Sequence, residues 1–365
     1  MPKVLLSARD AAAAHHIAEM VSLAAQPGWQ VVVVAQAPAL LILQALGVDC
    51  IPVLLPPVTV GSDAEAMLHL AKGLLDAEKP DIIVAGLSSP GDGGIDEALL
   101  AVRKVPALLM QDFWGEQNRF FGSGADAFLA LDEYARTVNQ AKHGKSSFVV
   151  GSPRHARLAR LDLAAERRKI RSKLNISENQ SVYGWFGQSL HHIPGYRKSL
   201  AAWIEAIADT GCQLVYKPHP RESAAGQQAT ESLFAAAGVT QRTLSDWTIE
   251  SALLACDVAT SILSNCLYDA AYLNYFSATP LIAPVAWLTE QEVRAVFDAV
   301  TSVHDLPYQS AGIAHLVQER ADMNRVRSAA LPETRRQLWQ AARANLTDPR
   351  EAGDRVAAAI LATLN

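Results

Sequence analysis

The sequence predicts an α/β protein with two domains, each built around a doubly wound parallel sheet. Its 365 residues exceed what one hydrophobic core ordinarily supports. Short apolar runs alternate with segments of helical spacing from the N-terminus onward. This alternation stops at a charged segment, 154–179, and then restarts. Strands and helices in alternation with short connections are typical of parallel sheets.

Composition narrows the class of protein. Half of the residues are apolar and 19% are charged, as in an ordinary globular protein. A net charge of −5 argues against a nucleic-acid-binding protein, which normally carries a basic surface. No apolar run has the roughly 18 residues that a membrane span needs, and the N-terminal residues do not resemble a signal peptide. We expect a cytoplasmic enzyme with no transmembrane segment; peripheral attachment to a membrane stays open.

The first domain is expected to span 1–153. Runs rich in Val, Ile, Leu and Ala predict its strands at 4–7, 29–35, 50–53, 81–87, 106–111, 127–131 and 148–150. Helices are expected at 11–25, 38–46, 64–77, 95–103 and 133–143. A glycine-rich loop, 88–94, lacks the GxGxxG and Gly-Lys-Ser/Thr patterns and contains Asp92. For this loop we favour a mobile segment beside an active cleft over a phosphate cradle.

A helical connector, 154–179, leads to the second domain, 180–345. We interpret its many charges as a solvated helix face, with contact to an acidic acceptor or a membrane as the alternative. The expected strands of the second domain are 182–186, 213–216, 240–244, 257–262 and 279–283, and its helices are 196–209, 223–237, 246–255 and one that ends at Leu273. Beyond 289 the chain is expected to be mostly helical. Residues 346–365 form a C-terminal helix whose packing against the first domain stays open.

One charged turn stands out in the second domain. The segment Lys217-Pro218-His219-Pro220-Arg221-Glu222 directly follows an expected buried strand. Its two prolines stiffen the turn and exclude a helix or a central strand there. In open α/β sheets, ligands bind beyond the carboxyl ends of the strands. A cation, an imidazole and a guanidinium at this edge indicate an anion site; a merely solvated turn is the alternative.

Two further loops are expected to meet this turn, because the carboxyl ends of parallel strands share one edge of the sheet. The candidate nucleotide and phosphate ligands are Gly187, Gln188, Ser189, Lys217, His219, Arg221, Ser261, Ser264 and Asn265. Backbone amides, hydroxyls and cationic side chains all donate hydrogen bonds to phosphate. Either His191 or His192 is expected to assist. The other histidines are interpreted as structural: His15, His16, His69, His143, His155, His304 and His315.

The first domain supplies the candidate base and acceptor residues. A general base that removes a proton from an attacking hydroxyl is expected among its carboxylates. Our first candidate is Asp10, and the next are Asp112 and Glu116. The loop after the strand 106–111 holds polar and aromatic side chains that suit a sugar, although aromatics folded back on the core are an equal alternative. The candidate acceptor residues are Arg9, Trp114 and Arg119.

Several of these segments resemble a known family. The Lys217-Pro218-His219-Pro220 segment is similar to the HP motif of bacterial capsule, sialic-acid and glycerol-phosphate transferases, and Ser261 to Ser264 resembles their serine motif. With the Gly151-Ser152-Pro153 junction, they look like glycosyltransferases of the GT-B fold, whose layout UDP-N-acetylglucosamine 2-epimerases share. The resemblance implies two Rossmann-like domains facing across a cleft, with the imidazole and the hydroxyls on the donor nucleotide.

Departures from these families shape the functional expectation. Ser264-Asn265-Cys266 stands where the epimerases carry an Asp-Ser-Gly-Gly-type loop, which weakens the epimerase alternative. The pair of glutamates that many retaining transferases carry is absent. This absence favours a mechanism that inverts the configuration of the anomeric carbon. We expect a metal-independent glycosyltransferase that moves a sugar from a nucleotide-sugar donor to an acceptor hydroxyl in surface polysaccharide or glycoconjugate synthesis. No metal or cofactor is expected beyond the nucleotide sugar as co-substrate. The acceptor is a sugar or glycan, and the oligomeric state stays open.

Two alternatives remain at this point. One is a nucleotide-sugar 2-epimerase or hydrolase of the same fold. The other is a protein that binds a nucleotide sugar without catalysis, since one architecture hosts many chemistries.

Overall fold

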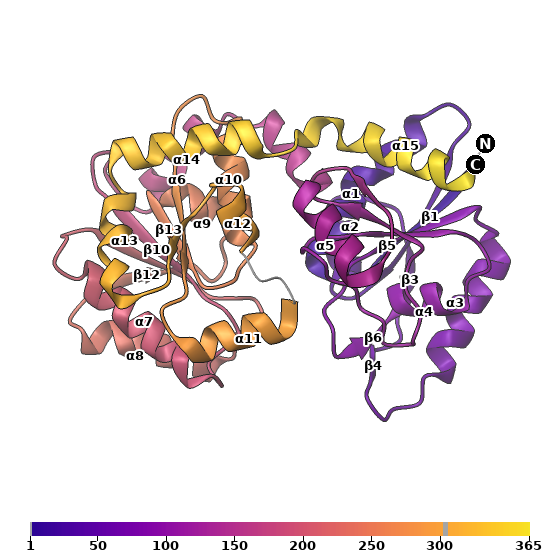
Figure 1. Cartoon of the computed structure of the whole chain (residues 1–365), viewed down its shortest axis with the longest axis horizontal. Coiled ribbons are helices and arrows are strands. Elements are labelled where there is room, and N and C mark those ends of the chain that lie inside the picture. Colours follow the sequence, from indigo (N-terminus) through magenta and orange to yellow (C-terminus); the bar gives the residue numbers. More distant parts are fainter. Residues whose placement is uncertain (1, 302–305) are drawn as a thin grey trace. The chain divides into compact units, whose positions relative to one another are not determined.

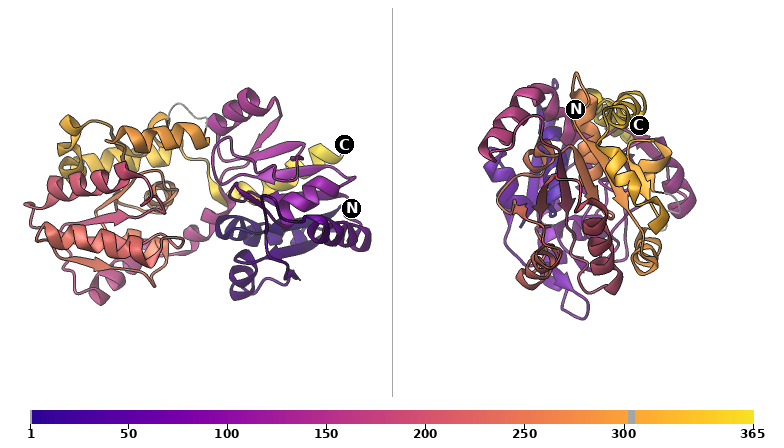
Figure 2. Two further views of the ribbon diagram at one scale, coloured as in Figure 1. Left: turned by 90° about the horizontal axis from the view of Figure 1, so that it is seen from below. Right: turned by 90° about the vertical axis from the view of Figure 1, so that its left-hand side faces the viewer.

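The structure is a computed structural model that describes residues 2–301 and 306–365. The histidine at 304 lies outside the described residues. Contacts divide the chain into two compact units. Unit 1 consists of Met1–Arg157 together with Thr347–Asn365, and unit 2 is the continuous segment Leu158–Leu346. Figures 1 and 2 show helices on both sides of the sheet in each unit.

The described part of unit 1 holds a seven-stranded parallel sheet in the order β3-β2-β1-β5-β7-β8-β9. The strands are β1 (Lys3–Ala8), β2 (Gln30–Gln36), β3 (Ile51–Val53), β5 (Ile82–Gly86), β7 (Ala107–Met110), β8 (Ala127–Ala130) and β9 (Ser147–Val149). A separate two-stranded pair joins β4 (Val58–Thr59) to β6 (Asp92–Gly93). Because the strand order reverses between β1 and β5, the loops after these two strands border the crevice where doubly wound sheets bind ligands.

Helices of unit 1 cover this sheet because its strands are apolar on both faces. They are α1 (Ala11–Met20), η1 (Val21–Ala25), α2 (Ala39–Ala45), α3 (Glu65–Glu78), α4 (Ile95–Val102), α5 (Glu133–His143) and α15 (Ala352–Leu364). The core contains Leu5, Val34, Ile83, Leu109 and Phe128, all of them at most 3% exposed. The C-terminal helix α15 contacts α1, η1 and β9, so the end of the chain completes unit 1.

The described part of unit 2 holds a six-stranded parallel sheet in the order β12-β11-β10-β13-β14-β15. The strands are β10 (Val182–Phe186), β11 (Gln213–Lys217), β12 (Gln241–Thr243), β13 (Val258–Ser261), β14 (Ala283–Trp287) and β15 (His315–Val317). The helices are α6 (Leu163–Lys173), α7 (Pro194–Ile207), α8 (Ala224–Ala236), α9 (Ile249–Ala255), α10 (Cys266–Phe276), α11 (Gln291–Thr301), α12 (Pro307–Ser310), α13 (Asn324–Ala329) and α14 (Pro332–Asn345). Here the order reverses between β10 and β13. Both units are therefore Rossmann-like, as expected.

Three expectations about secondary structure need correction. The strand expected at 279–283 begins at Ala283, because the Asn274 side chain binds the backbone before it: its amide donates to the Ile282 carbonyl and its oxygen accepts from the Leu281 amide. Strand β15 lies in the part of the chain beyond 289 that was expected to be mostly helical. The helix expected at 11–25 changes to a 3₁₀ helix after Met20.

The connector 154–179 also differs from expectation. It contains the 3₁₀ helix η2 (Pro153–Arg160) and the helix α6, whose first turn is capped by the Asp162 carboxylate. Arg171 is 2% exposed, so the charges of α6 are not all on a solvated face. Within the described residues, no helix combines the length and the apolar character of a membrane-spanning segment.

Candidate functional site

A pocket lies at the carboxyl ends of β10 and β11 in unit 2. Its volume is about 300 Å³, and it is lined by Gln188, Ser189, Leu190, His219 and Arg221. Four of these residues belong to the set expected to bind a nucleotide. The structure therefore brings together the loop after β10 and the charged turn after β11, as parallel pairing of these strands requires.

Gln188 fixes the loop after β10 in place. Its amide N–H donates to the Tyr196 hydroxyl at 2.9 Å. Its side-chain oxygen accepts from the Leu263 amide, also at 2.9 Å, which ties this loop to the loop after β13. The Ser189 hydroxyl donates to the Arg221 carbonyl at 3.1 Å. The bond between Gln188 and Leu263 crosses the point where the strand order reverses, and together the three bonds hold the rim of the pocket in one arrangement.

The hydrogen bonds of His219 define which nitrogen carries the proton. The Arg221 amide donates to Nδ1 at 3.1 Å, so Nδ1 is an acceptor and the neutral ring carries its hydrogen on Nε2. Burial lowers the pKa of His219, Arg221 lowers it further, and Glu222 opposes this effect. At neutral pH the ring is therefore an uncharged donor through Nε2.

Glu222 organises the charged turn, a role that sequence reasoning did not assign. Its side chain is fully buried. One carboxylate oxygen accepts from His191 Nε2 at 2.7 Å, and the other accepts from the His219 amide at 3.1 Å. A Cβ on Gly187 would lie 2.7 Å from that second oxygen, so the position accommodates glycine. An acid two residues after the Pro-His-Pro segment was the available signal.

The other candidate nucleotide ligands of unit 2 do not line this pocket. The Lys217 ammonium donates to the Ser245 carbonyl at 2.8 Å, in the segment after β12, and does not line the pocket beside His219. Ser261 is fully buried and its hydroxyl donates to the Phe186 carbonyl at 2.7 Å, so it offers no hydroxyl to a phosphate. The Ser264 hydroxyl accepts from the Cys266 amide, and the Asn265 side chain accepts from the Tyr308 hydroxyl.

In unit 1, Asp10 lies at the other strand-order reversal. It follows β1, and its Oδ2 accepts from both the amide and the hydroxyl of Ser89, at 2.8 and 2.7 Å. Ser89 belongs to the loop after β5. Asp10 thus joins the two loops that border the ligand-binding crevice of a doubly wound sheet.

Among the candidate bases, Asp112 has the most informative shift in pKa. Burial raises its pKa from 3.8 to about 6, Arg154 opposes the rise, and Asp10 and Glu116 add to it. Burial also raises the pKa of Glu116, and Lys142 opposes this effect from 3.8 Å. The three expected carboxylates therefore share one electrostatic neighbourhood, and a base whose pKa lies near neutrality suits proton transfer.

Two of the three candidate acceptor residues are buried and bonded within unit 1. The Trp114 ring is 1% exposed and its Nε1 donates to the Asp132 carboxylate at 2.9 Å, so the aromatic is folded back on the core. The Arg9 side chain is 4% exposed and pairs with Asp92 at 2.6 Å and Glu97 at 3.6 Å. The polar groups of both side chains thus already have partners within unit 1. Arg119 is exposed and donates to the Gly122 carbonyl.

Sequence reasoning missed a buried acidic pair on α4. The Asp96 carboxylate accepts from the hydroxyls of Ser7 and Ser88, at 2.5 and 2.8 Å. Burial raises the pKa of Asp96 to about 6 and that of Glu97 to about 7. An Asp-Glu pair at the start of a helix is too common a pattern to reveal this burial.

The glycine-rich loop is anchored, which corrects the expectation of a mobile segment. The Asn118 side chain donates to the carbonyls of Ser89 and Asp92, at 2.9 and 2.8 Å. The Gly94 amide donates to the Glu97 carboxylate at 2.8 Å. Across the described residues, no three His, Cys, Asp or Glu side chains are grouped so as to hold a metal ion.

Comparison with known proteins identifies the fold. No protein-family model matches this sequence, and no curated protein matches it significantly. A putative UDP-N-acetylglucosamine 2-epimerase from Listeria monocytogenes superposes with a TM-score of 0.69 at 14% identity, over 98% of this chain and 95% of its own. S. aureus MnaA with UDP gives 0.70 at 12% identity, over 100% and 97%.

A glycosyltransferase from Rickettsia africae gives a TM-score of 0.65 at 10% identity, over 100% of this chain and 98% of its own. At such low identity the likeness establishes the fold alone. The fold is the GT-B type that epimerases and glycosyltransferases share, with two Rossmann-like domains.

Proposed function

We propose that this chain is an enzyme that acts on a nucleotide sugar and holds the nucleotide's phosphate groups in the pocket of unit 2. The observation that carries the proposal is that pocket, with its volume of about 300 Å³. It lies at the carboxyl ends of β10 and β11, the edge of the sheet where doubly wound folds bind ligands. Among similar solved structures, one contains UDP and another, from Neisseria meningitidis, is bound to UDP-GlcNAc.

The charge of the pocket supports an anionic ligand. Arg221 supplies a guanidinium and His219 supplies an N–H donor, whereas no carboxylate lines the pocket. The nearby Glu222 carboxylate is buried and is occupied by His191 and the His219 amide. A phosphate group would accept charge-assisted hydrogen bonds from Arg221 without meeting an opposing negative charge.

We assign the reaction as transfer of the sugar to an acceptor hydroxyl. Asp112 in unit 1 is the proposed general base, which removes the proton of the acceptor hydroxyl. As it does so, the hydroxyl oxygen bonds to the anomeric carbon of the donor sugar. The bond from that carbon to the nucleotide diphosphate breaks, and the diphosphate leaves with the electron pair. A single displacement of this kind inverts the anomeric centre. With a pKa of about 6, the Asp112 carboxyl group is ionised at neutral pH and is still basic enough to accept the proton of the hydroxyl.

Epimerisation of a nucleotide sugar is the second candidate. It requires groups that remove and return a proton at one carbon, and unit 1 contains several carboxyl groups of raised pKa, namely Asp96, Glu97, Asp112 and Glu116.

Nucleotide binding is tested by thermal unfolding with UDP, CMP, CDP and GDP. A ligand that binds the native state raises the unfolding midpoint. We expect one nucleotide to stabilise the wild type, His219→Ala to abolish that shift, and His192→Ala to preserve it, because His192 is exposed and does not line the pocket. An unchanged shift in His219→Ala would place the nucleotide elsewhere.

The reaction type is tested by incubating the enzyme with the nucleotide sugar alone. Turnover that requires an added acceptor supports transfer. A new nucleotide sugar or free sugar formed without acceptor contradicts transfer and supports epimerisation or hydrolysis.

A further inference from the structure

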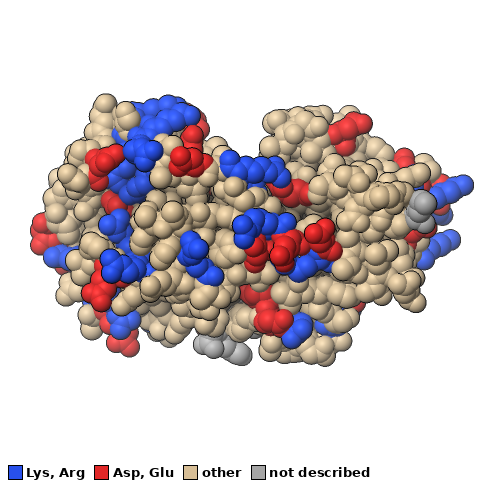
Figure 3. Space-filling model, turned by 90° about the horizontal axis from the view of Figure 1, so that it is seen from above, with Lys and Arg blue, Asp and Glu red and all other residues tan. Residues whose placement is uncertain are grey.

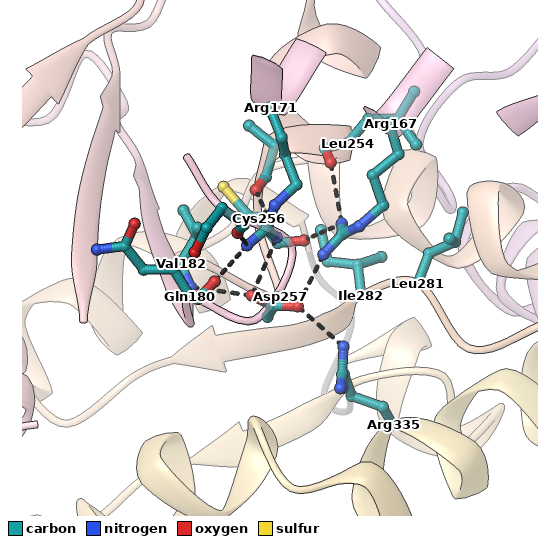
Figure 4. Close-up of polar contacts among 12 residues, drawn as sticks. Arg167, Arg171, Gln180, Val182, Leu254, Cys256, Asp257, Leu281, Ile282 and Arg335 are labelled. Atoms are coloured by element: carbon teal, nitrogen blue, oxygen red, sulfur yellow. Dashed lines mark hydrogen bonds and ion pairs between the residues drawn. The ribbon is translucent and has the colours of Figure 1, made fainter. Parts of the chain in front are cut away.

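A second charged cluster lies at the opposite edge of the sheet in unit 2. Asp257 immediately precedes β13, so it sits at the amino end of a strand, whereas the His219 pocket lies at the carboxyl ends of β10 and β11. Its Oδ1 accepts from Arg167 at 2.7 Å and from Arg335 at 2.9 Å, and its Oδ2 lies 3.3 Å from Arg171 Nη1 (Figure 4). Three guanidinium groups from two helices thus converge on one carboxylate.

Structural demands account for two of these arginines. Arg167 donates to the carbonyls of Leu254 and Cys256, and Arg171 donates to the Ala255 carbonyl, at the end of α9. Cationic side chains commonly bind the exposed carbonyls at a helix C-terminus. Arg167 and Arg171 therefore fasten α6 to α9, whether or not a ligand binds nearby.

Arg335 and Arg168 do not share that role. Arg335 reaches Asp257 from α14, and its Nε is buried without a hydrogen-bond partner among the described residues. Arg168 is exposed on α6. Neither residue binds the end of α9. Buried guanidinium N–H groups are costly when they lack an acceptor.

These side chains line a pocket of about 340 Å³. Its charged members are Arg167, Arg168, Arg171, Arg335, Glu178 and Asp257, which leaves a formal charge of +2 in a chain whose net charge is −5. Burial lowers the pKa of Arg167, and Asp257 opposes this effect. The positive charges of Arg171 and Arg335 lower the pKa further, as expected where positive charge is in excess. Figure 3 shows Lys and Arg side chains gathered over unit 2, on the side that carries α6 and α14 in Figure 1.

We propose that this pocket is a second anion-binding site, which takes a phosphate group through Arg335 and Arg168. Guanidinium groups bind phosphate oxygens through paired N–H donors. The remaining wall, formed by Ala164, Thr279, Pro280 and Leu281, presents mostly apolar surface and one hydroxyl residue to the rest of a small molecule. The proposal is independent of the nucleotide-sugar function, since none of these residues lines the His219 pocket.

The test is calorimetric titration of the full chain with pyrophosphate at near-physiological salt. We expect saturable binding, and both Arg335→Gln and Arg168→Gln should weaken it by about tenfold or more, the usual effect of losing a charge-assisted hydrogen bond. Arg168→Gln is the safer variant for folding because its side chain is exposed. The matched control is Arg336→Gln, which removes an exposed charge next to Arg335 without altering the lining of the pocket.

Each titration is repeated in the His219→Ala background. Binding that survives His219→Ala and is lost in Arg335→Gln belongs to the second site. Affinity unchanged by both arginine substitutions, or no binding to the wild type, overturns the proposal.

A sedimentation assay identifies the source of the phosphate. Vesicles of phosphatidylcholine with phosphatidylglycerol that capture the wild type, but not Arg335→Gln, would indicate a lipid headgroup. Binding of pyrophosphate without capture by vesicles would indicate a soluble phosphate compound.

Discussion

Replacing Gly187 with alanine provides a sharp test of how the His219 turn is held. The new Cβ would lie 2.7 Å from Glu222 Oε2 and 3.2 Å from Tyr216 Cε2. Ordinary contacts at such a position begin near 3.4 Å, so the carboxylate must move. It is fully buried and bonded to His191 and to the His219 amide, and movement weakens both bonds. We expect a loss of about 1–3 kcal/mol in the free energy of unfolding, from overpacking and weakened hydrogen bonds.

The assay is urea unfolding, with hydrogen exchange assigning the loss to unit 2. A Gly73→Ala control, in helix α3 with nothing within 4 Å of the new Cβ, should be neutral or stabilise by up to about 1 kcal/mol. A double-mutant cycle isolates the cause, because in a Glu222→Ala background the cost of Gly187→Ala should largely vanish. A coupling energy above about 1 kcal/mol supports the reasoning. Additive effects of the two substitutions would refute it.

The remaining predictions concern single residues. The folded-state pKa of Asp112, about 6, exceeds its ordinary 3.8, so the contribution of Asp112 to stability falls as the pH rises from 3.8 to 6. In urea titrations, Asp112→Asn should therefore gain stability relative to wild type between about pH 4 and 7. A stability difference that stays constant with pH would contradict the assigned burial. Trp114→Phe should lower stability by about 1–3 kcal/mol through loss of the hydrogen bond from Nε1 to the buried side of the Asp132 carboxylate, while leaving the Michaelis constants unchanged. Lys217→Met should keep the nucleotide-induced thermal shift, since its ammonium is bonded to Ser245; loss of the shift would return Lys217 to the pocket.

Strand positions and loop order could be predicted from the sequence because they depend on local patterns. The run 182–186 coincides with β10, and parallel pairing then requires the loop after it to meet the turn at His219. What a strand-end side chain touches depends on its neighbours. Ser261 donates to a carbonyl of β10, 75 residues earlier, and no pattern around Ser261 distinguishes this from a hydroxyl that faces a ligand.

Partners distant in sequence explain most of the other differences. Trp114 is buried because Asp132, 18 residues later, accepts its N–H. Arg171 belongs to a segment that resembles a solvated helix until Asp257, 86 residues later, supplies its carboxylate. Burial of Asp96 likewise depends on Ser7, which lies 89 residues earlier. Each case requires the tertiary neighbour to be known before the role of the side chain can be inferred.

The division of the chain has a consequence for its synthesis. Unit 2 is one continuous segment, Leu158–Leu346, inserted between the two segments of unit 1. The ribosome therefore synthesises all of unit 2 before Thr347–Asn365, so the second segment of unit 1 is the last part of the two units to become available for folding. Unit 1 must wait for α15, whose Val356 and Ile360 are buried and which contacts α1 and η1. A premature stop shortly after residue 346 would leave an intact unit 2 attached to a unit 1 with exposed apolar surface, the kind of intermediate that chaperones retain.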